Sequence, residues 1–214
     1  MLKDLILALP VLFLTSLINI PLTAQTRQID LSAGIGFVSF DQLNIELGSE
    51  RGPLVVNHSS FISFVSGKYF LAKKFAIGVT VATQNITGNS NDTWISATGH
   101  TPFSYNMTTL TIAPEITLAY VRRKFFIFYT ILGAGYDHYF VNYSYYNSYG
   151  GNGDYKIIPN NINWQYTPLG FRFGNTLSGF LELGLGYKGL LNFGMSYRIG
   201  KSGHPSIQKN HPIE

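Results

Sequence analysis

Residues 180–199 have the sequence FLELGLGYKGLLNFGMSYRI, in which large apolar side chains recur at every second position. The first half places apolar residues on one face, namely Leu181, Leu183, Leu185 and Tyr187. The second half repeats the alternation with Leu191, Phe193, Met195, Tyr197 and Ile199. Because side chains alternate across a strand, the two halves predict two strands joined near Lys188-Gly189. The opposite faces carry Gly, Ser, Asn and a few charges, which is typical of a barrel with lipid outside and a narrow polar lumen.

The amino-terminal segment has the features of a secretory signal peptide. Lys3 precedes an apolar stretch from Leu5 to Leu22, and Ala24 offers a small residue for cleavage. We therefore expect residues 1–24 to be removed and the chain to be exported. Beyond Leu22 no apolar run approaches the ~20 residues that a membrane-spanning helix needs. If the chain enters a membrane, the sequence predicts that it does so as strands.

The composition narrows the classes of protein to consider. Charged residues make up 12% of the chain, against about 25% in typical soluble domains. There is no cysteine, which excludes a disulfide-stapled module. The formal charge is +4, but the basic residues are scattered, so no nucleic-acid partner is expected. No metal-ligand spacing occurs, and we expect neither a metal nor another cofactor.

Alternating patterns predict eight strands over residues 28–40, 60–70, 75–85, 107–121, 125–140, 164–173, 180–187 and 190–199. In the second of these, Ile62 and Phe64 share a face with Ser66 and Lys68, so we expect a bulge near Ser66-Gly67. Residues 25–200 would form one barrel domain, and the polar segment 201–214 a disordered tail.

The connections between the predicted strands alternate in length. Long polar segments follow the first, third and fifth strands, at residues 41–57, 87–103 and 141–162, whereas the other turns are short. Outer-membrane barrels have short periplasmic turns and long outer loops. The sequence therefore predicts an all-β fold, an eight-stranded antiparallel transmembrane β-barrel. Aromatic residues beside the short turns would form a girdle: Tyr69, Phe75, Tyr120, Phe125, Phe126, Phe173 and Tyr197.

Two segments resemble a known family. Residues 67–78, GKYFLAKKFAIG, are similar to the strand-turn-strand of the small outer-membrane β-barrels common in Bacteroidota, which are related in architecture to the OmpA and OmpX barrels. Residues 168–173, 179–186 and 191–198 are similar to that family's three closing strands. The resemblance implies a bacterial outer-membrane location, lipid contacts, insertion by the barrel-assembly machinery and a monomer. Its motifs encode barrel geometry and no chemistry.

Four charged residues fall on the predicted lumen face: Glu115, Arg172, Glu182 and Arg198. Isolated charges are costly when they are desolvated, so we expect these four to form a paired network. The resemblance to OmpA-like barrels implies a plug that stabilises the barrel. An ion path or gate is the alternative function of the same network. The main functional prediction is thus a non-enzymatic barrel with a structural or small-pore role.

A tyrosine-rich loop offers a second function. Residues 141–162 carry Tyr143, Tyr145, Tyr146, Tyr149 and Tyr155 among Asn, Gly and Ser. Tyrosine in such surroundings supplies contact area at low entropic cost, as in adaptable binding loops. The chain could then act as a surface adhesin or as the binding component of a secretion or adhesion machine, with a surface ligand that the sequence does not identify.

Two further alternatives are weaker. An outer-membrane hydrolase would need a nucleophile and a base, for which the candidates are His58, Ser59, Ser60, His100, Asp137 and His138. No nucleophile motif surrounds the serines, and neighbours in a strand such as Asp137 and His138 point to opposite faces. A soluble, exported, lipocalin-like binder would need its apolar residues inside, which the glycine-rich polar face does not favour.

Overall fold

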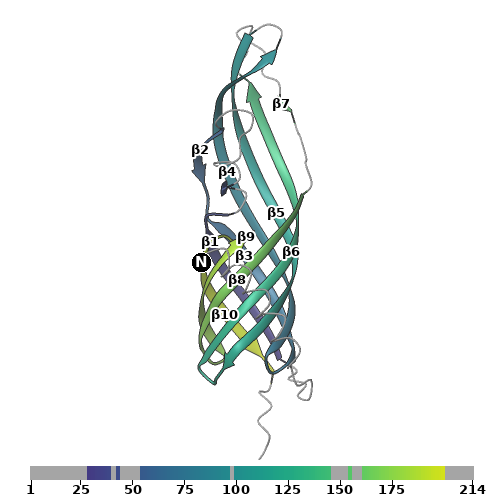
Figure 1. The fold of residues 1–214 in the computed structure, drawn as a ribbon, viewed down its shortest axis with the longest axis vertical. Coiled ribbons are helices and arrows are strands. Elements are labelled where there is room, and N and C mark those ends of the chain that lie inside the picture. The colour runs from purple at the N-terminus through teal and green to yellow at the C-terminus, as the bar shows by residue number, and fades with distance from the viewer. Residues whose placement is uncertain are drawn as a thin grey trace, which may run out of the picture.

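The protein forms a closed, eight-stranded antiparallel β-barrel, seen from the side in Figure 1. The computed structural model describes residues 28–39, 42–43, 54–96, 99–145, 154–155 and 161–200. The expected signal peptide, 1–24, and the expected tail, 201–214, lie outside these residues. The fold class predicted from the sequence is confirmed.

Ten strands occur among the described residues: β1 (Gln28–Phe37), β2 (Leu54–Ser59), β3 (Ile62–Ala72), β4 (Phe75–Ser96), β5 (Gly99–Arg122), β6 (Phe126–Tyr145), β7 (Asp154–Tyr155), β8 (Asn161–Gly174), β9 (Leu177–Gly186) and β10 (Leu191–Ile199). Antiparallel pairing runs β1-β3-β4-β5-β6-β8-β9-β10 and returns to β1. The ring closes where β1 pairs with β10, with Asp30 opposite Arg198 and Gly34 opposite Gly194. Strands β2 and β7 stay outside the ring and pair with β4 and β6.

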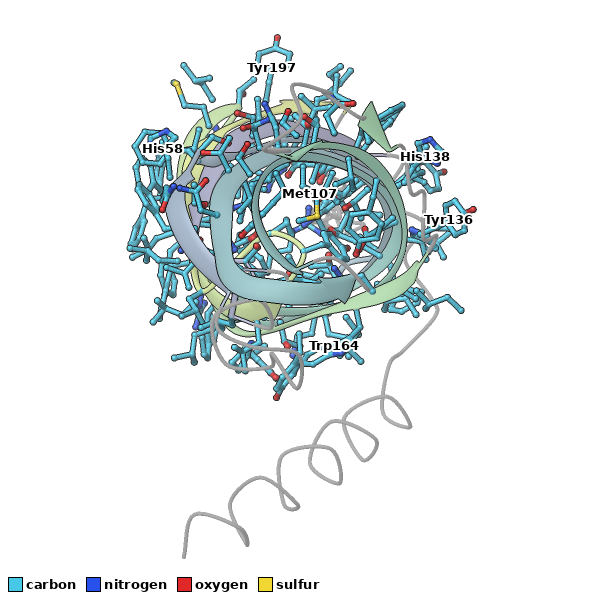
Figure 2. The ribbon with its side chains drawn as sticks, turned by 90° about the horizontal axis from the view of Figure 1, so that it is seen from above. His58, Met107, Tyr136, His138, Trp164 and Tyr197 are labelled. Carbon is cyan, nitrogen blue, oxygen red and sulfur yellow. The ribbon has the colours of Figure 1, made fainter. Side chains whose placement is uncertain are left out.

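The barrel carries its apolar side chains on the outside. Along β9 and β10, exposed residues such as Leu181, Leu183, Phe193 and Met195 alternate with buried residues such as Glu182. Seen from above, side chains radiate outward from the ring, among them Tyr136, Trp164 and Tyr197, and others fill its interior (Figure 2). The alternation read from the sequence therefore separates an apolar exterior from a polar interior, as expected for these strands.

The middle strands are longer than the sequence predicts. Residues 87–103 were expected to form a loop, but β4 and β5 continue pairing from Thr87 with Asn106 up to Ser96 with Gly99. β6 likewise continues to Tyr145, and β2 occupies the end of the expected 41–57 connection. In Figure 1 this sheet of β4, β5 and β6 rises well above the barrel. The Asn, Ser and Thr residues that suggest a loop are here paired with a neighbouring strand, and such context outweighs strand propensity.

Two local expectations were wrong. The pairing of β3 with β1 and β4 is regular through Ser66-Gly67, and the irregularity lies between Phe70 and Ala72 instead. Ile62 and Phe64 therefore point into the barrel, where both are buried. Tyr187 was placed on the outer face, yet it is only 3% exposed, because β9 ends at Gly186 and the chain turns inward there.

A candidate site in the barrel lumen

A buried lysine joins two carboxylates across the middle of the lumen. The ammonium Nζ of Lys188 lies 3.0 Å from Oε1 of Glu115 on β5 and 3.2 Å from Oε2 of Glu182 on β9. All three side chains are almost fully buried. Because a buried charge without a partner is costly, this geometry ties strands on different sides of the ring together.

Neutral and charged donors complete this cluster. The hydroxyl of Tyr187 donates a hydrogen bond of 2.9 Å to Glu115, and that of Tyr129 donates one of 2.8 Å to Glu182. Lys68 on β3 lies 3.7 Å from the second oxygen of Glu115. Two lysines thus face two glutamates, and formal charge is balanced within this group, which we call the central cluster: Lys68, Glu115, Tyr129, Glu182, Tyr187 and Lys188.

The turn between β9 and β10 delivers Lys188 to the lumen. Gly186 has a φ of 134°, a conformation that L side chains rarely adopt, and it redirects Tyr187 and Lys188 inward. The backbone N–H of Lys188 donates a 2.9 Å hydrogen bond to Gln165, which fixes the turn against β8. Two carboxylates beside it, those of Glu115 and Glu182, favour the charged form of the Lys188 ammonium.

Aromatic rings fill the lumen beside this cluster. Phe64 and Phe180 are buried, and their ring centroids lie 6.0 Å apart. A Cβ on Gly34 or on Gly194 would collide with the Phe180 ring. The paired glycines of β1 and β10 therefore make the room that the rings occupy, which explains why small residues recur on the inner face.

A second group of charges lies nearer the short turns. Arg172 on β8 pairs with Asp30 on β1, and Nη2 of Arg198 on β10 lies 3.6 Å from the same carboxylate. Arg122, at the end of β5, donates to Gln28 and, at 2.6 Å, to the Lys73 carbonyl. We call Asp30, Arg122, Arg172 and Arg198 the arginine cluster.

A third polar group surrounds Asp137 towards the long strands. This carboxylate is fully buried and accepts hydrogen bonds from Thr111 (2.5 Å), Asn163 (2.8 Å) and Tyr139 (3.2 Å). Neutral donors can hold a buried carboxylate when several converge on it. Asp137 therefore serves as a junction between β5, β6 and β8.

Of the four charges singled out in the sequence, all are buried or half-buried in the lumen, but they do not form one network. Glu115 and Glu182 belong to the central cluster, whereas Arg172 and Arg198 belong to the arginine cluster. Sequence reasoning missed their partners Lys188, Lys68 and Asp30. Asp30 and Lys68 could have been found, because both lie on inner faces of predicted strands, but Lys188 was hidden in a turn.

The tyrosines of the expected binding loop are only partly described. Tyr143 and Tyr145 lie in β6, and Tyr155 lies in β7, opposite Tyr143. Tyr146 and Tyr149 lie outside the described residues. The segment therefore contributes to the sheet that extends above the barrel.

The serine and histidine candidates have other surroundings. The Ser59 hydroxyl donates to Gln42 and accepts from Gln84, at 3.0 and 2.9 Å. His58 lies exposed in β2, and His100 lies in β5. His138 packs edge-on against Phe140, with 4.6 Å between ring centroids. Asp137 points instead into the lumen, as the alternation predicts.

No group of three or more His, Cys, Asp or Glu residues in the described part of the chain could hold a metal ion. Within the same residues, no helix is long and apolar enough to cross a membrane.

The class of molecule defined by this geometry is a closed barrel with an apolar exterior and an ion-paired interior. The sequence matches no family model and no curated protein. Among solved structures, the chain is similar to Ail, the attachment invasion locus protein of Yersinia pestis, crystallised in complex with the heparin analogue sucrose octasulfate. The identity is 11%, the TM-score is 0.42, and the match covers 82% of this chain and 100% of Ail. A likeness at this level carries no argument about function.

Proposed function

We propose that the protein is an integral barrel of a bacterial outer membrane, with a plugged lumen and a structural, non-enzymatic role. On this proposal the chain is exported by its signal peptide, is inserted by the barrel-assembly machinery, and acts as a monomer in contact with outer-membrane lipids. The observation that carries the proposal is the distribution of side chains, apolar outside and ion-paired inside.

The length of the shorter strands supports a membrane location. Strands β1 and β9 have 10 residues each, and β10 has 9. Ten residues rise about 33 Å along a strand, or roughly 23 Å when the strand is tilted by about 45°. This height is close to the ~25 Å apolar band of outer-membrane barrels. A soluble lipocalin-like barrel would place such residues inside.

Aromatic residues mark one border of the apolar band. Near the short turns, Phe125, Phe173 and Tyr197 are more than half exposed. Rings of neighbouring strands lie close together, with 5.3 Å between the centroids of Phe126 and Phe173. Aromatic rings at the end of an apolar band are typical of the boundary between lipid and water.

The filled lumen supports a plug rather than a conducting pore. Two cavities of about 40 and 10 Å³ lie inside the barrel, and no residue lines both of them. The central cluster and the rings of Phe64 and Phe180 lie between these cavities. An ion would have to break several buried ion pairs to pass, which disfavours the small-pore role.

A gel and a conductance recording test this proposal. The detergent-extracted outer-membrane fraction is run with and without boiling, and the purified barrel is added to a planar bilayer. We expect a band that changes mobility on boiling and no conductance steps. A periplasmic band without a shift would refute the membrane location, and regular conductance steps would refute the plug.

The sheet above the barrel supports a second candidate function, adhesion at the cell surface. β4, β5 and β6 extend beyond the ring, and β2 and β7 widen the sheet at its edges (Figure 1). The strands that carry Tyr143, Tyr145 and Tyr155 belong to it. Deleting residues 146–153 should reduce cell adhesion but leave the boiling shift intact. Unchanged adhesion would count against this function.

A further inference from the structure

The arginine cluster carries more positive than negative charge. The guanidinium groups of Arg172 and Arg198 pair with one carboxylate, that of Asp30. A third guanidinium, that of Arg122, lies over the same Phe70 ring as that of Arg198. The central cluster supplies no surplus carboxylate, because Glu115 and Glu182 are already engaged by Lys68 and Lys188. Two positive charges therefore remain without a counter-charge among the described residues at this end of the barrel.

Several donors of the same cluster have no acceptor. Nε and Nη2 of Arg172, Nε and Nη2 of Arg198, and the hydroxyl of Ser196 are buried without a hydrogen-bond partner. Arg172 is 5% exposed and Ser196 is 4% exposed. Buried polar groups are almost always paired, and an unpaired charged donor is especially costly. The three unpaired donors of Arg172 and Ser196, both of which line one cavity, thus favour an acceptor that the protein itself does not supply.

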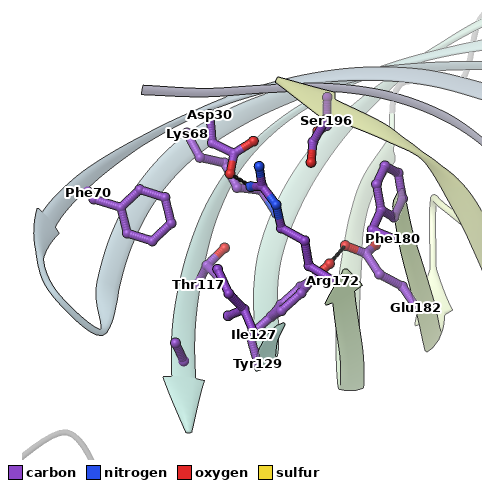
Figure 3. Close-up of a pocket in the computed structure, with 12 residues that line it drawn as sticks. Asp30, Lys68, Phe70, Thr117, Ile127, Tyr129, Arg172, Phe180, Glu182 and Ser196 are labelled. Carbon is purple, nitrogen blue, oxygen red and sulfur yellow. Dashed lines mark hydrogen bonds and ion pairs between the residues drawn. The ribbon is translucent and has the colours of Figure 1, made fainter. Parts of the chain in front are cut away.

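A cavity lies at the unpaired donors of Arg172 and Ser196. It has a volume of about 40 Å³ and is lined by Arg172, Ser196 and Asp30, together with Lys68 and Glu182 of the central cluster. Figure 3 shows the Arg172 guanidinium reaching towards Asp30, with the Ser196 side chain close to it on another strand. This volume has room for roughly three water molecules, which is comparable with one small oxyanion. The strands of the ring surround the cavity, so a ligand would come from water and not from the bilayer.

We propose that this cavity binds a small soluble oxyanion of the phosphate class, held by Arg172 and Ser196 and balanced by Arg198. Planar guanidinium groups present paired donors that match the oxygens of such anions. Asp30 pairs with Nη1 of Arg172, which leaves Nε and Nη2 of the same guanidinium for the ligand. The inference goes beyond the proposed function, because a membrane barrel needs no such ligand.

Inorganic phosphate tests the site through its effect on unfolding. The purified full-length barrel is unfolded by heat in a non-ionic detergent at increasing phosphate, with sodium chloride holding the ionic strength constant. A ligand that binds only the folded state raises the unfolding midpoint in a saturable way. We expect such a rise for phosphate and none for matched sodium chloride. Equal midpoints in the two salts would overturn the proposal, since water alone would then fill the cavity.

Substitutions at the cavity test whether the effect of phosphate on the unfolding midpoint arises there. Ser196→Ala removes one donor, and Arg198→Gln removes one buried charge. Arg172 is left intact because its Nη1 pairs directly with Asp30, which Arg198 approaches only to 3.6 Å. Arg123→Gln is the control, since it removes the same charge from an exposed turn residue. Loss of a charged donor should raise the phosphate concentration needed for half the effect by about tenfold or more. Wild-type responses in both S196A and R198Q would overturn the site.

The two proposals fail in different ways. A barrel that still changes its gel mobility on boiling but ignores phosphate overturns the anion site alone. The smaller variant S196A keeps the test decisive if R198Q does not fold.

Discussion

Lys188 and Glu115 meet 3.0 Å apart in the middle of the barrel, although one lies in the turn after β9 and the other in the last third of β5. The pair closes the lumen from two sides, since the turn reaches inward and β5 lies across the ring from it. Glu182 binds the same ammonium at 3.2 Å, so Lys188 neutralises two carboxylates that would otherwise repel each other. The turn is thus the element that makes the lumen a plug.

Replacing Lys188 by Gln should destabilise the barrel strongly. The change leaves Glu115 and Glu182 buried with only Lys68 as a cation, and breaking a buried pair costs about 3–5 kcal/mol. Urea unfolding in detergent, followed by intrinsic fluorescence, measures the loss. Lys124→Gln, at an exposed turn residue, should change the free energy of unfolding by less than about 0.5 kcal/mol. Equal effects of the two substitutions would contradict the role of Lys188.

Glu182 and Lys188 should be energetically coupled. Glu182→Gln alone should loosen the barrel, because it leaves Lys188 with fewer negative partners. In a barrel that already carries Lys188→Gln, Glu182→Gln should lower the free energy of unfolding by less, because the carboxylate that it removes has already lost its ammonium partner. A double-mutant cycle should give a coupling energy of about 1–3 kcal/mol. Additive effects, together with unchanged conductance in E182Q, would remove the central cluster as a functional unit.

Because apolar side chains alternate with polar or small ones along the sequence, the closed barrel and the side chains on its outer and inner surfaces could be predicted. Alternation along β9 and β10 fixes which side chains point outward, and the lengths of the turns fix the order of the strands. The positions of the lumen charges along the barrel axis could not be predicted from this alternation. Asp30 lies opposite Arg198 and Lys68 only because of the register between strands, which alternation does not specify.

The position of Lys188 was unpredictable for another reason. The sign of φ at Gly186, and not any periodic pattern, decides whether Tyr187 and Lys188 point inward. The long strands were missed because Asn, Ser and Gly are common both in loops and in the paired extension of β4 and β5. Local composition does not reveal whether a partner strand is present.

Gly186 should not tolerate a side chain. Its φ of 134° is strained for any L residue, and a Cβ there would collide with the Trp164 carbonyl oxygen. Gly186→Ala should therefore cost at least about 1–2 kcal/mol, and more if Tyr187 loses its bond to Glu115. Gly179→Ala is the matched control on the same strand, because the nearest atom to its added Cβ lies 3.9 Å away. Thermal unfolding compares them, and a G186A barrel as stable as G179A would refute this account of the turn.

A charge in the apolar band should distinguish a membrane barrel from a soluble one. Met195 lies in the middle of β10 and is 57% exposed, so Met195→Arg would place a cation on the outer face. In a bilayer this should cost about 2–4 kcal/mol at the midplane, because no water solvates the guanidinium there. Asn175→Arg, in the exposed turn after β8, should be nearly neutral. Folding into lipid vesicles at graded urea measures both variants. If M195R folds as readily as N175R, the exterior faces water, and the outer-membrane proposal fails while the closed barrel and its central cluster stand.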